Sequence, residues 1–333
     1  MRLLVTGGAG FIGSNFIRYW LERHPDDHVV AYDLLTYAGN RESLADVENR
    51  IVFVHGDIAD NELAERVLRD EAIDVVVNFA AESHNSLAVL DPGLFARTNV
   101  LGTQMLLEAA RRHSVKRFHH VSTCEVYGDL ALDSGEAFTE ESPYRPRTPY
   151  NASKAAADHY VRAYFETFGL PVTISNCSNN FGPYQFPEKV IPLFVTNALE
   201  DLPLPMYAST ENRREWLHVL DHCEAIELIL DRGRPGETYN VGSGVEASIE
   251  EIADRVLELT NKPAELKTIV PDRPGHDRRY LLDSTKLGGE LGWVPRHDFE
   301  TGLAETVRWY ADNRAWWEPL KGRAPVEETA WSS

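Results

Sequence analysis

Short apolar runs alternate with longer segments of helical periodicity through the first half of the chain. The apolar runs predict strands at residues 3–6, 28–32, 51–55, 75–79 and 117–122. The segments between them predict helices at residues 11–23, 61–71, 99–113 and 149–168. Strands that alternate with helices of this length form βαβ units. We therefore expect an α/β fold with a Rossmann-type, doubly wound parallel sheet that helices cover on both faces.

The regular alternation loosens after Gly169. One more strand is predicted at residues 171–175, and a Pro-rich stretch follows it. The remaining pattern predicts helices at residues 188–199, 249–260 and 301–313, and strands at residues 217–219 and 237–241. We expect a first domain of residues 1–175, joined by parts of residues 215–245, and a smaller, discontinuous α/β domain of residues 176–333 that is interleaved with it.

The composition narrows the possible partners. A length of 333 residues suits about two domains, and 43% hydrophobic with 26% charged residues is ordinary for a soluble globular protein. The formal net charge of −19 makes nucleic acids and anionic membranes poor partners. Cys124, Cys177 and Cys223 form no CxxC pair, which indicates a reducing compartment without disulfides or a metal site. No apolar run approaches the roughly 20 residues of a membrane helix, and the first strand begins too early for a leader, so we expect a cytoplasmic protein.

A glycine-rich segment, Gly7–Gly13 (GGAGFIG), lies between the first predicted strand and the first helix. Glycines permit the tight turn and let a pyrophosphate approach the backbone, while the helix N-terminus offers free N–H groups. Asp33 closes the second strand at the distance expected of a carboxylate that binds the adenosine ribose. Leu34 follows it in place of a basic residue, so NAD is favoured over NADP. Asp57, after the third strand, is placed to cap the adenine.

A tyrosine and a lysine are four residues apart at the start of the helix predicted at residues 149–168. Tyr150 and Lys154 therefore project from the same face of that helix. An ammonium group near a phenol favours the phenolate and lowers the pKa of the tyrosine from about 10. Tyr150 would then serve as a base for a substrate hydroxyl. Thr123, at the end of a strand, would supply a hydroxyl partner for the same oxygen.

Six longer strings mark a resemblance to a known family. They are Thr36–Asn40, Ala80–His84, Glu125–Gly128, Asn176–Tyr184, Phe186–Lys189 and Asp272–Tyr280. Together with the glycine segment and the Tyr150–Lys154 pair, they make the chain resemble the extended short-chain dehydrogenases/reductases, and among these the dTDP-glucose 4,6-dehydratases. The similarity runs along nearly the whole chain and is far more specific than the glycine pattern alone.

The resemblance implies a sugar-nucleotide substrate and a tightly held NAD that is recycled in each turnover. Tyr150, assisted by Lys154 and Thr123, would take the proton of the sugar 4-hydroxyl while hydride moves from C4 to NAD. Glu125 would then remove the C5 proton, water would leave from C6, and hydride would return to C6 to give a 4-keto-6-deoxy sugar. The resemblance also implies a homodimer that uses the helices predicted at residues 99–113 and 149–168.

The resemblance also assigns binding positions to this chain. Those for the cofactor are Gly7, Gly10, Phe11, Ile12, Gly13, Asp33, Leu34, Thr36, Asp57, Ile58, Ala80, Ala81, Ser83, Thr98, Tyr150 and Lys154. Those for the substrate are Ser83, His84, Asn85, Asn179, Lys189, Tyr207, Arg214, Asn240, Arg273 and His276. In this scheme Tyr207 packs on the base. The cations Lys189, Arg214 and Arg273 converge on the diphosphate despite the net negative charge of the chain.

Two departures from the family pattern affect the expected chemistry. The dehydratases carry Asp at the position of Cys124, and that Asp is thought to protonate the departing hydroxyl. A thiol holds its proton at about pH 7 but is a weak donor, so Cys124 is either a substitute catalytic acid or a small apolar filler. After His84, residues 85–89 (NSLAV) replace a stretch that has an acidic and a basic residue in the family.

The departures leave alternatives open. In one, hydride returns to C4 and the product, a nucleotide sugar or nucleoside, keeps an exocyclic 5,6-alkene. A nucleotide-sugar 4-epimerase would share Tyr150 and Lys154 but needs no base at C5, so Glu125 argues against it. A non-catalytic NAD-binding regulator is disfavoured because Thr123, Tyr150 and Lys154 are all present. The adjacent His119 and His120 are expected to be structural.

Overall fold

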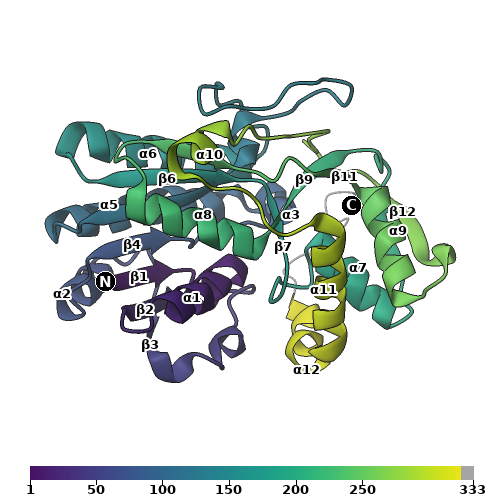
Figure 1. Ribbon diagram of the computed structural model, residues 1–333, viewed down its shortest axis with the longest axis horizontal. Coiled ribbons are helices and arrows are strands. Elements are labelled where there is room, and N and C mark those ends of the chain that lie inside the picture. Colours follow the sequence, from purple (N-terminus) through teal and green to yellow (C-terminus); the bar gives the residue numbers. More distant parts are fainter. Residues whose placement is uncertain (324–333) are drawn as a thin grey trace.

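The computed structural model describes residues 1–323, and its largest element is a seven-stranded sheet (Figure 1). The strands are β1 (Arg2–Thr6), β2 (His28–Asp33), β3 (Ile51–His55), β4 (Val75–Asn78), β5 (Arg117–Thr123), β6 (Val172–Cys177) and β10 (Thr238–Val241). All are parallel, in the order β10-β6-β5-β4-β1-β2-β3. The strand order reverses between β1 and β4, where doubly wound sheets bind ligands beyond their carboxyl ends. The predicted fold class is confirmed.

Helices cover both faces of this sheet. They are α2 (Asn61–Asp70), α5 (Thr103–Arg112) and α6 (Pro149–Phe168) on one face, and α1 (Phe11–Arg23) and α8 (Val219–Arg232) on the other. Side chains alternate along the strands, so Leu4 and Val76 pack under the first group while Leu3 and Val75 pack under the second. The apolar character of these strands follows from burial on both faces.

A smaller unit lies at one end of the sheet, on the right of Figure 1. Its strands are β7 (Asn179–Phe181), β8 (Leu204–Tyr207), β9 (Arg213–His218), β11 (Glu246–Ser248) and β12 (Lys267–Val270). They form a β11-β9-β7 sheet and a β12-β8 pair. Its helices are α7 (Val190–Leu199), α9 (Ile249–Thr260), α11 (Phe299–Asp312) and α12 (Arg314–Trp317). Phe194, Trp216 and Trp317 are buried in its core.

Besides several 3-10 turns, the described chain contains three more short helices and one π-helical turn. They are α3 (Asn85–Leu90), α4 (Pro92–Phe95), the π-helical turn η3 (Ala96–Gly102) and α10 (Thr285–Leu291). The helix predicted at residues 99–113 is therefore η3 followed by α5. Asn99 within η3 turns its side chain toward Glu82, whose backbone N–H and C=O it binds. π-Helical turns of this kind occur frequently at functional sites.

Helix α6 has the predicted bounds, and local sequence explains both ends. The Thr148 hydroxyl accepts a hydrogen bond from the backbone N–H of Asn151 (3.2 Å), and Pro149 occupies the first helical turn. Gly169 ends the helix in the left-handed region at φ +68°. Tyr150 is thus fixed in the first turn.

One region of the second half was predicted wrongly. The strand expected at residues 217–219 ends at His218, and Val219 begins α8, a helix of 14 residues that the pattern analysis did not predict. The His218 imidazole accepts a hydrogen bond from the backbone N–H of Leu220 and so caps α8. Strand and helix meet without a Gly or Pro between them, so the apolar run conceals the boundary.

The two units are interleaved along the chain, because β9 belongs to the smaller one whereas α8 and β10 belong to the larger. The exact division into domains stays a prediction, and residues 324–333 of the predicted second domain lie outside the described residues. Within residues 1–323, every helix is too short or too polar to cross a membrane.

Candidate active site

A cavity of about 1100 Å³ lies between the carboxyl ends of the parallel strands and the smaller unit. Every residue predicted to bind the cofactor lines this cavity, as do Thr123, Glu125 and the predicted substrate positions other than Asn240. The volume is at the upper end of the range for small-molecule and cofactor sites. One cavity therefore holds the predicted cofactor, catalytic and substrate residues.

The glycine segment forms a turn that admits no larger side chain at two positions. A Cβ on Gly13 would lie 2.2 Å from the carbonyl oxygen of Gly7, and a Cβ on Gly7 would lie 2.8 Å from the backbone nitrogen of Ala80. Gly7 also has φ +65°, which glycine adopts without strain. The turn brings the N-terminus of α1 to the cavity, where its free N–H groups suit a pyrophosphate.

Asp33 lines the same end of the cavity. Its carboxylate accepts hydrogen bonds from the backbone N–H groups of Ala9 (2.9 Å) and Leu35 (2.7 Å), which fix its orientation. Burial raises its pKa, and the two N–H groups oppose that rise. Each carboxylate oxygen keeps a lone pair for a ribose hydroxyl. The chemistry of this end fits the adenosine of NAD.

Tyr150 and Lys154 are both buried at the cavity wall, which Thr123 also lines. The Lys154 ammonium donates to the carbonyl oxygen of Val121 (2.8 Å). Burial raises the pKa of Tyr150 well above its usual value, and the Glu125 carboxylate raises it further. The predicted lowering of the Tyr150 pKa is therefore wrong, because burial and the Glu125 charge raise it.

Glu125 follows β5 on a short 3-10 turn and faces the cavity. Its carboxylate accepts a hydrogen bond from the Asn85 side-chain amide (3.3 Å), and the Asn85 carbonyl accepts one from the Thr148 hydroxyl (3.2 Å). Asp277 also lines the cavity; burial, reinforced by the charge of Glu125, raises its pKa to about 6. Asn85 thus contacts Glu125, the predicted base.

Cationic side chains also line the cavity. They are Lys189, Arg214 and Arg273. Arg214 is anchored by donating to the carbonyl oxygen of Asp277 (2.7 Å), and its guanidinium lies 4.7 Å from the centre of the Tyr280 ring. The buried Nη1 of Arg273 has no hydrogen-bond partner within residues 1–323. A buried guanidinium nitrogen without a partner is costly, and an anionic ligand would satisfy it.

Similarity to known proteins extends along almost the whole chain. A sequence model of the family described as GDP-mannose 4,6 dehydratase matches residues 4–306. The chain belongs to the GDP-mannose 4,6 dehydratase family. It is 52% identical over 322 residues to dTDP-glucose 4,6-dehydratase from Mycobacterium tuberculosis, with 96% of each chain covered.

Solved structures agree with this membership of the dehydratase family. DesIV, a dTDP-glucose 4,6-dehydratase from Streptomyces venezuelae solved with NAD and TYD bound, has a TM-score of 0.93 and 52% identity, covering 96% of this chain and all of its own. A Bacillus anthracis dTDP-glucose 4,6-dehydratase in complex with NAD has a TM-score of 0.90 and 46% identity, covering 96% of this chain and all of its own. The predicted place among extended short-chain dehydrogenases/reductases, near these dehydratases, is confirmed.

Two predicted site residues of this family member lie away from the cavity wall. Cys124 is buried among Val126, Tyr127, Ala155, Tyr280 and Leu282, and burial raises the pKa of its thiol well above the usual value. Asn240 is buried too: its side-chain amide donates to the carbonyl oxygen of Phe138, and its carbonyl accepts from the Tyr127 hydroxyl. Both side chains serve the packing beneath the site.

Glu188, for which the sequence predicted no role, also lines the cavity, beside His84 and Lys189. Glu188 accepts a hydrogen bond from the Tyr37 hydroxyl (2.8 Å) and lies 3.3 Å from the His84 Nε2. Lys189 donates to the carbonyl oxygen of Ser83 (3.0 Å). Glu188 and Lys189 directly precede α7. Their adjacent opposite charges after Pro187 are the sequence feature that could have predicted a role for Glu188.

Proposed function

We propose that this chain is an NAD-dependent hydro-lyase that acts as a dTDP-glucose 4,6-dehydratase. The observation that carries the proposal is the placement of Thr123, Glu125, Tyr150 and Lys154 on one cavity beside the glycine turn. The reaction oxidises C4 of the sugar, eliminates water across C5 and C6, and returns the hydride to C6. The similarity to curated dTDP-glucose 4,6-dehydratases along 96% of the chain supports this substrate class.

The residues present fit NAD as a resident cofactor. Gly10 and the N-terminus of α1 would hold its pyrophosphate, and Asp33 would hold its adenosine ribose. NAD, when bound, supplies the hydride acceptor and later donor, and its positive nicotinamide favours the phenolate of Tyr150. The crystallised relatives with NAD support the same cofactor for this chain.

The oxidation step depends on Tyr150 as the base. Its phenolate takes the proton of the 4-hydroxyl, and the Thr123 hydroxyl on the same cavity wall would donate a hydrogen bond to the reacting oxygens. Lys154, buried on the next turn of α6, supplies the positive charge that the phenolate requires. Because burial raises the pKa of Tyr150, formation of the phenolate depends on positive charge close to the ring.

The elimination step depends on Glu125. Oxidation at C4 acidifies the hydrogen at C5, and the Glu125 carboxylate removes it. We assign Glu125 the return of that proton to the departing C6 oxygen as well, because Cys124 does not reach the cavity wall. The Asn85 amide, 3.3 Å from the Glu125 oxygen, orients the carboxylate for both transfers.

The cationic side chains of the cavity suit a nucleoside diphosphate. Lys189, Arg214 and the unpartnered Nη1 of Arg273 would bind the phosphate oxygens, and Tyr207 would pack on the base. His276, 5.1 Å from the Tyr207 ring centre, would support that ring. The anionic substrate is thus held by local charges in spite of the net charge of the chain.

Proton NMR and mass spectrometry of the product formed from dTDP-glucose test the proposed function. A 6-methyl doublet, the loss of one water and deuterium at C5 in heavy water are expected. Vinylic protons would instead establish the 5,6-alkene alternative, and an unchanged mass with inverted C4 would establish the epimerase. No turnover of dTDP-glucose, of other nucleotide sugars or of nucleosides, despite bound NAD, would leave the regulator as the remaining function.

We also propose that the chain forms a homodimer through η3, α5 and α6. A second, shallower cavity between η3 and α6 is lined mainly by apolar side chains. Leu101, Tyr160 and Phe168 in this region are 44%, 44% and 54% exposed. A contiguous exposed apolar surface is typical of a protein interface.

The three free cysteines are all buried, which suits action in the reducing cytoplasm.

A further inference from the structure

A line of ionisable side chains follows one face of α6 inward from the catalytic tyrosine. Tyr150, Lys154, Asp158 and Arg162 recur at intervals of four residues, and so lie above one another on the helix. Lys154 is 4% exposed and Asp158 is fully buried. A buried ammonium needs a counter-charge, and the proposed chemistry assigns Lys154 a role only while it is charged.

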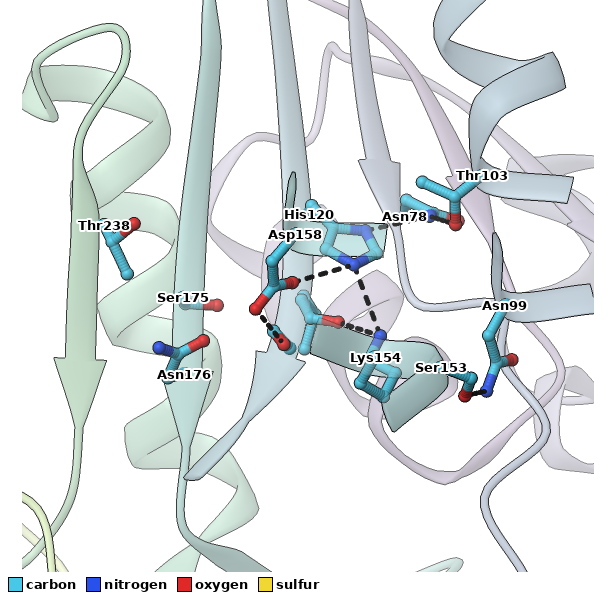
Figure 2. Close-up of polar contacts among 12 residues, drawn as sticks. Asn78, Asn99, Thr103, His120, Ser153, Lys154, Asp158, Ser175, Asn176 and Thr238 are labelled. Atoms are coloured by element: carbon cyan, nitrogen blue, oxygen red, sulfur yellow. Dashed lines mark hydrogen bonds and ion pairs between the residues drawn. The ribbon is translucent and has the colours of Figure 1, made fainter. Parts of the chain in front are cut away.

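His120 lies between these two buried charges. Its Nε2 is 3.4 Å from the Lys154 nitrogen and 3.5 Å from Oδ1 of Asp158, and Figure 2 shows the imidazole ring placed between the two side chains. Oδ1 of Asp158 accepts no hydrogen bond within residues 1–323, so its 3.5 Å distance to His120 is longer than a hydrogen bond, whereas Oδ2 accepts hydrogen bonds from the hydroxyls of Ser122 (2.9 Å) and Tyr144 (2.8 Å). One carboxylate oxygen is thus left for the histidine.

The surroundings of His120 fix which ring nitrogen carries hydrogen. The Thr6 hydroxyl donates to the carbonyl oxygen of the Asn78 side chain (2.6 Å), which sets the orientation of that amide. The Asn78 amide nitrogen then faces Nδ1 of His120 (3.1 Å), as Figure 2 shows, so Nδ1 is an acceptor. Burial and the charge of Lys154 hold the pKa of His120 well below its usual value. His120 is therefore neutral, and Nε2 carries its hydrogen. With this tautomer the 3.4 Å contact between Nε2 and the Lys154 nitrogen joins two donors and is not a hydrogen bond.

We propose that Asp158, oriented by the Nε2 hydrogen of His120, is the counter-charge that keeps Lys154 protonated for the Tyr150–Lys154 pair. His120 and Asp158 are positioning residues in this scheme, since neither lines the cavity. The inference rests on the proposed function for its catalytic consequence. It revises the expectation that both adjacent histidines are merely structural.

Other groups around Lys154 do not replace this carboxylate. From β6 the thiol of Cys177 faces Lys154, and burial raises its pKa to about 12, so it is neutral. From the turn after β5 the charge of Glu125 acts on Tyr150. Burial lowers the pKa of Lys154, and the charge of Asp158 raises it. Burial raises the pKa of Asp158, and the positive charges of Lys154 and Arg162 oppose this rise.

The kinetic test compares pH profiles of kcat and kcat/KM for NAD-loaded enzyme. Asp158→Asn removes the counter-charge, so the ammonium of Lys154 is lost at lower pH and the alkaline limb moves down by about one pH unit or more. His120→Leu should move the same limb in the same direction. His120→Gln should restore much of it, because the amide can donate to Asp158.

His119→Gln is the matched control. His119 is the neighbouring buried histidine on β5, and its ring nitrogens meet the hydroxyls of Thr173 and Ser175 at 3.0 Å. Its substitution should lower thermal stability without moving the alkaline limb. If Asp158→Asn and His120→Leu instead reduce activity by the same factor at every pH, their roles are structural and the proposal is overturned.

A second measurement does not depend on catalysis. In ¹⁵N-imidazole NMR spectra, the His120 signals are identified by their absence from His120→Gln. They should report a neutral ring with hydrogen on Nε2 from about pH 6 to 9. Hydrogen on Nδ1, or a charged ring, would overturn the assignment even if the protein proves inactive on dTDP-glucose. If the protein is inactive but gives the expected signals, the proposed function is refuted, whereas the proposed arrangement of Lys154, His120 and Asp158 is not.

Discussion

Three consecutive residues after β5 face different surroundings. Thr123 and Glu125 line the cavity, whereas Cys124 between them packs into the core. Extended backbone turns successive side chains to opposite sides, so this arrangement follows from the strand geometry of Thr123. The thiol of Cys124 therefore belongs to the packing under the site, and in the proposed function the proton chemistry is assigned to Glu125.

Substitutions of these two neighbours should separate packing from chemistry. Glu125→Gln should slow overall dehydration by about a hundredfold or more, since it removes the base for C5. Reduced cofactor should accumulate and deuterium exchange at C5 should cease. Cys124→Ala should keep the turnover while costing about 1–2 kcal/mol of unfolding free energy. A large loss of turnover in Cys124→Ala at unchanged stability would restore the thiol as a catalytic acid.

Tyr150→Phe tests the first half of the reaction. The substitution keeps the ring but removes the hydroxyl, so hydride transfer should fall by about a thousandfold. In contrast to Glu125→Gln, reduced cofactor should not accumulate. Tyr160→Phe on the exposed side of the same helix is the control, and its rate should match the parent. Absorbance of the reduced cofactor after rapid mixing with substrate distinguishes the two steps.

The sequence predicted the residues of the site better than their environments. Glycine spacing and the position of Asp33 identify the cofactor end, because both follow from local chain geometry. The raised pKa of Tyr150 could not be predicted, since it depends on burial by distant segments and on Glu125. Asn240 was misplaced for the same reason: its hydrogen bonds go to Tyr127 and Phe138, far away in the sequence.

Among the elements, the turn between β1 and α1 tolerates the least change. Gly13→Ala would place a methyl group against the Gly7 carbonyl, where 2.2 Å is available. The turn must open, and the N-terminus of α1 then loses its approach to a pyrophosphate. We expect the purified variant to contain little NAD, as measured by release on denaturation. Gly135→Ala, where the added Cβ meets nothing within 4 Å, should retain NAD like the parent.

The junction between α8 and the segment before α11 should give the fold a pH dependence. His297 Nδ1 lies 2.7 Å from Asp221, and this hydrogen bond raises the pKa of the histidine. Its stabilising contribution is fully present below the unfolded pKa of about 6.5 and is lost as pH rises through the folded value.

His297→Gln should therefore lower the melting temperature more at about pH 6 than at about pH 9. The difference between the two losses of unfolding free energy should be under about 1 kcal/mol. Thermal unfolding at both pH values measures the difference. Exposed His159→Gln is the control. A loss that is equal at the two pH values would show that packing against His218, whose ring centre is 4.1 Å away, matters more than charge.

At the scale of the whole molecule, the strand order forms the cavity, and cationic residues from distant segments of the chain line it. The reversal at β1 and β4 creates the cavity, and the smaller unit, built from segments on both sides of α8, brings Lys189, Arg214 and Arg273 to it. Such assembly from distant segments explains how a chain of net charge −19 can present a cationic site. Helix α8 escaped prediction for a local reason, because it continues directly from β9 without a Gly or Pro between them.

The apolar surface on η3 and α6 sets the last prediction, which concerns assembly. Leu101→Lys places a charge in the proposed interface, where desolvation of an ammonium opposes association. Sedimentation velocity should give a dimer for the parent chain and a monomer for the variant. Leu259→Lys is the matched control, because Leu259 is 43% exposed on α9, away from this surface. If the parent is monomeric, or if both variants remain dimeric, the interface lies elsewhere or does not exist.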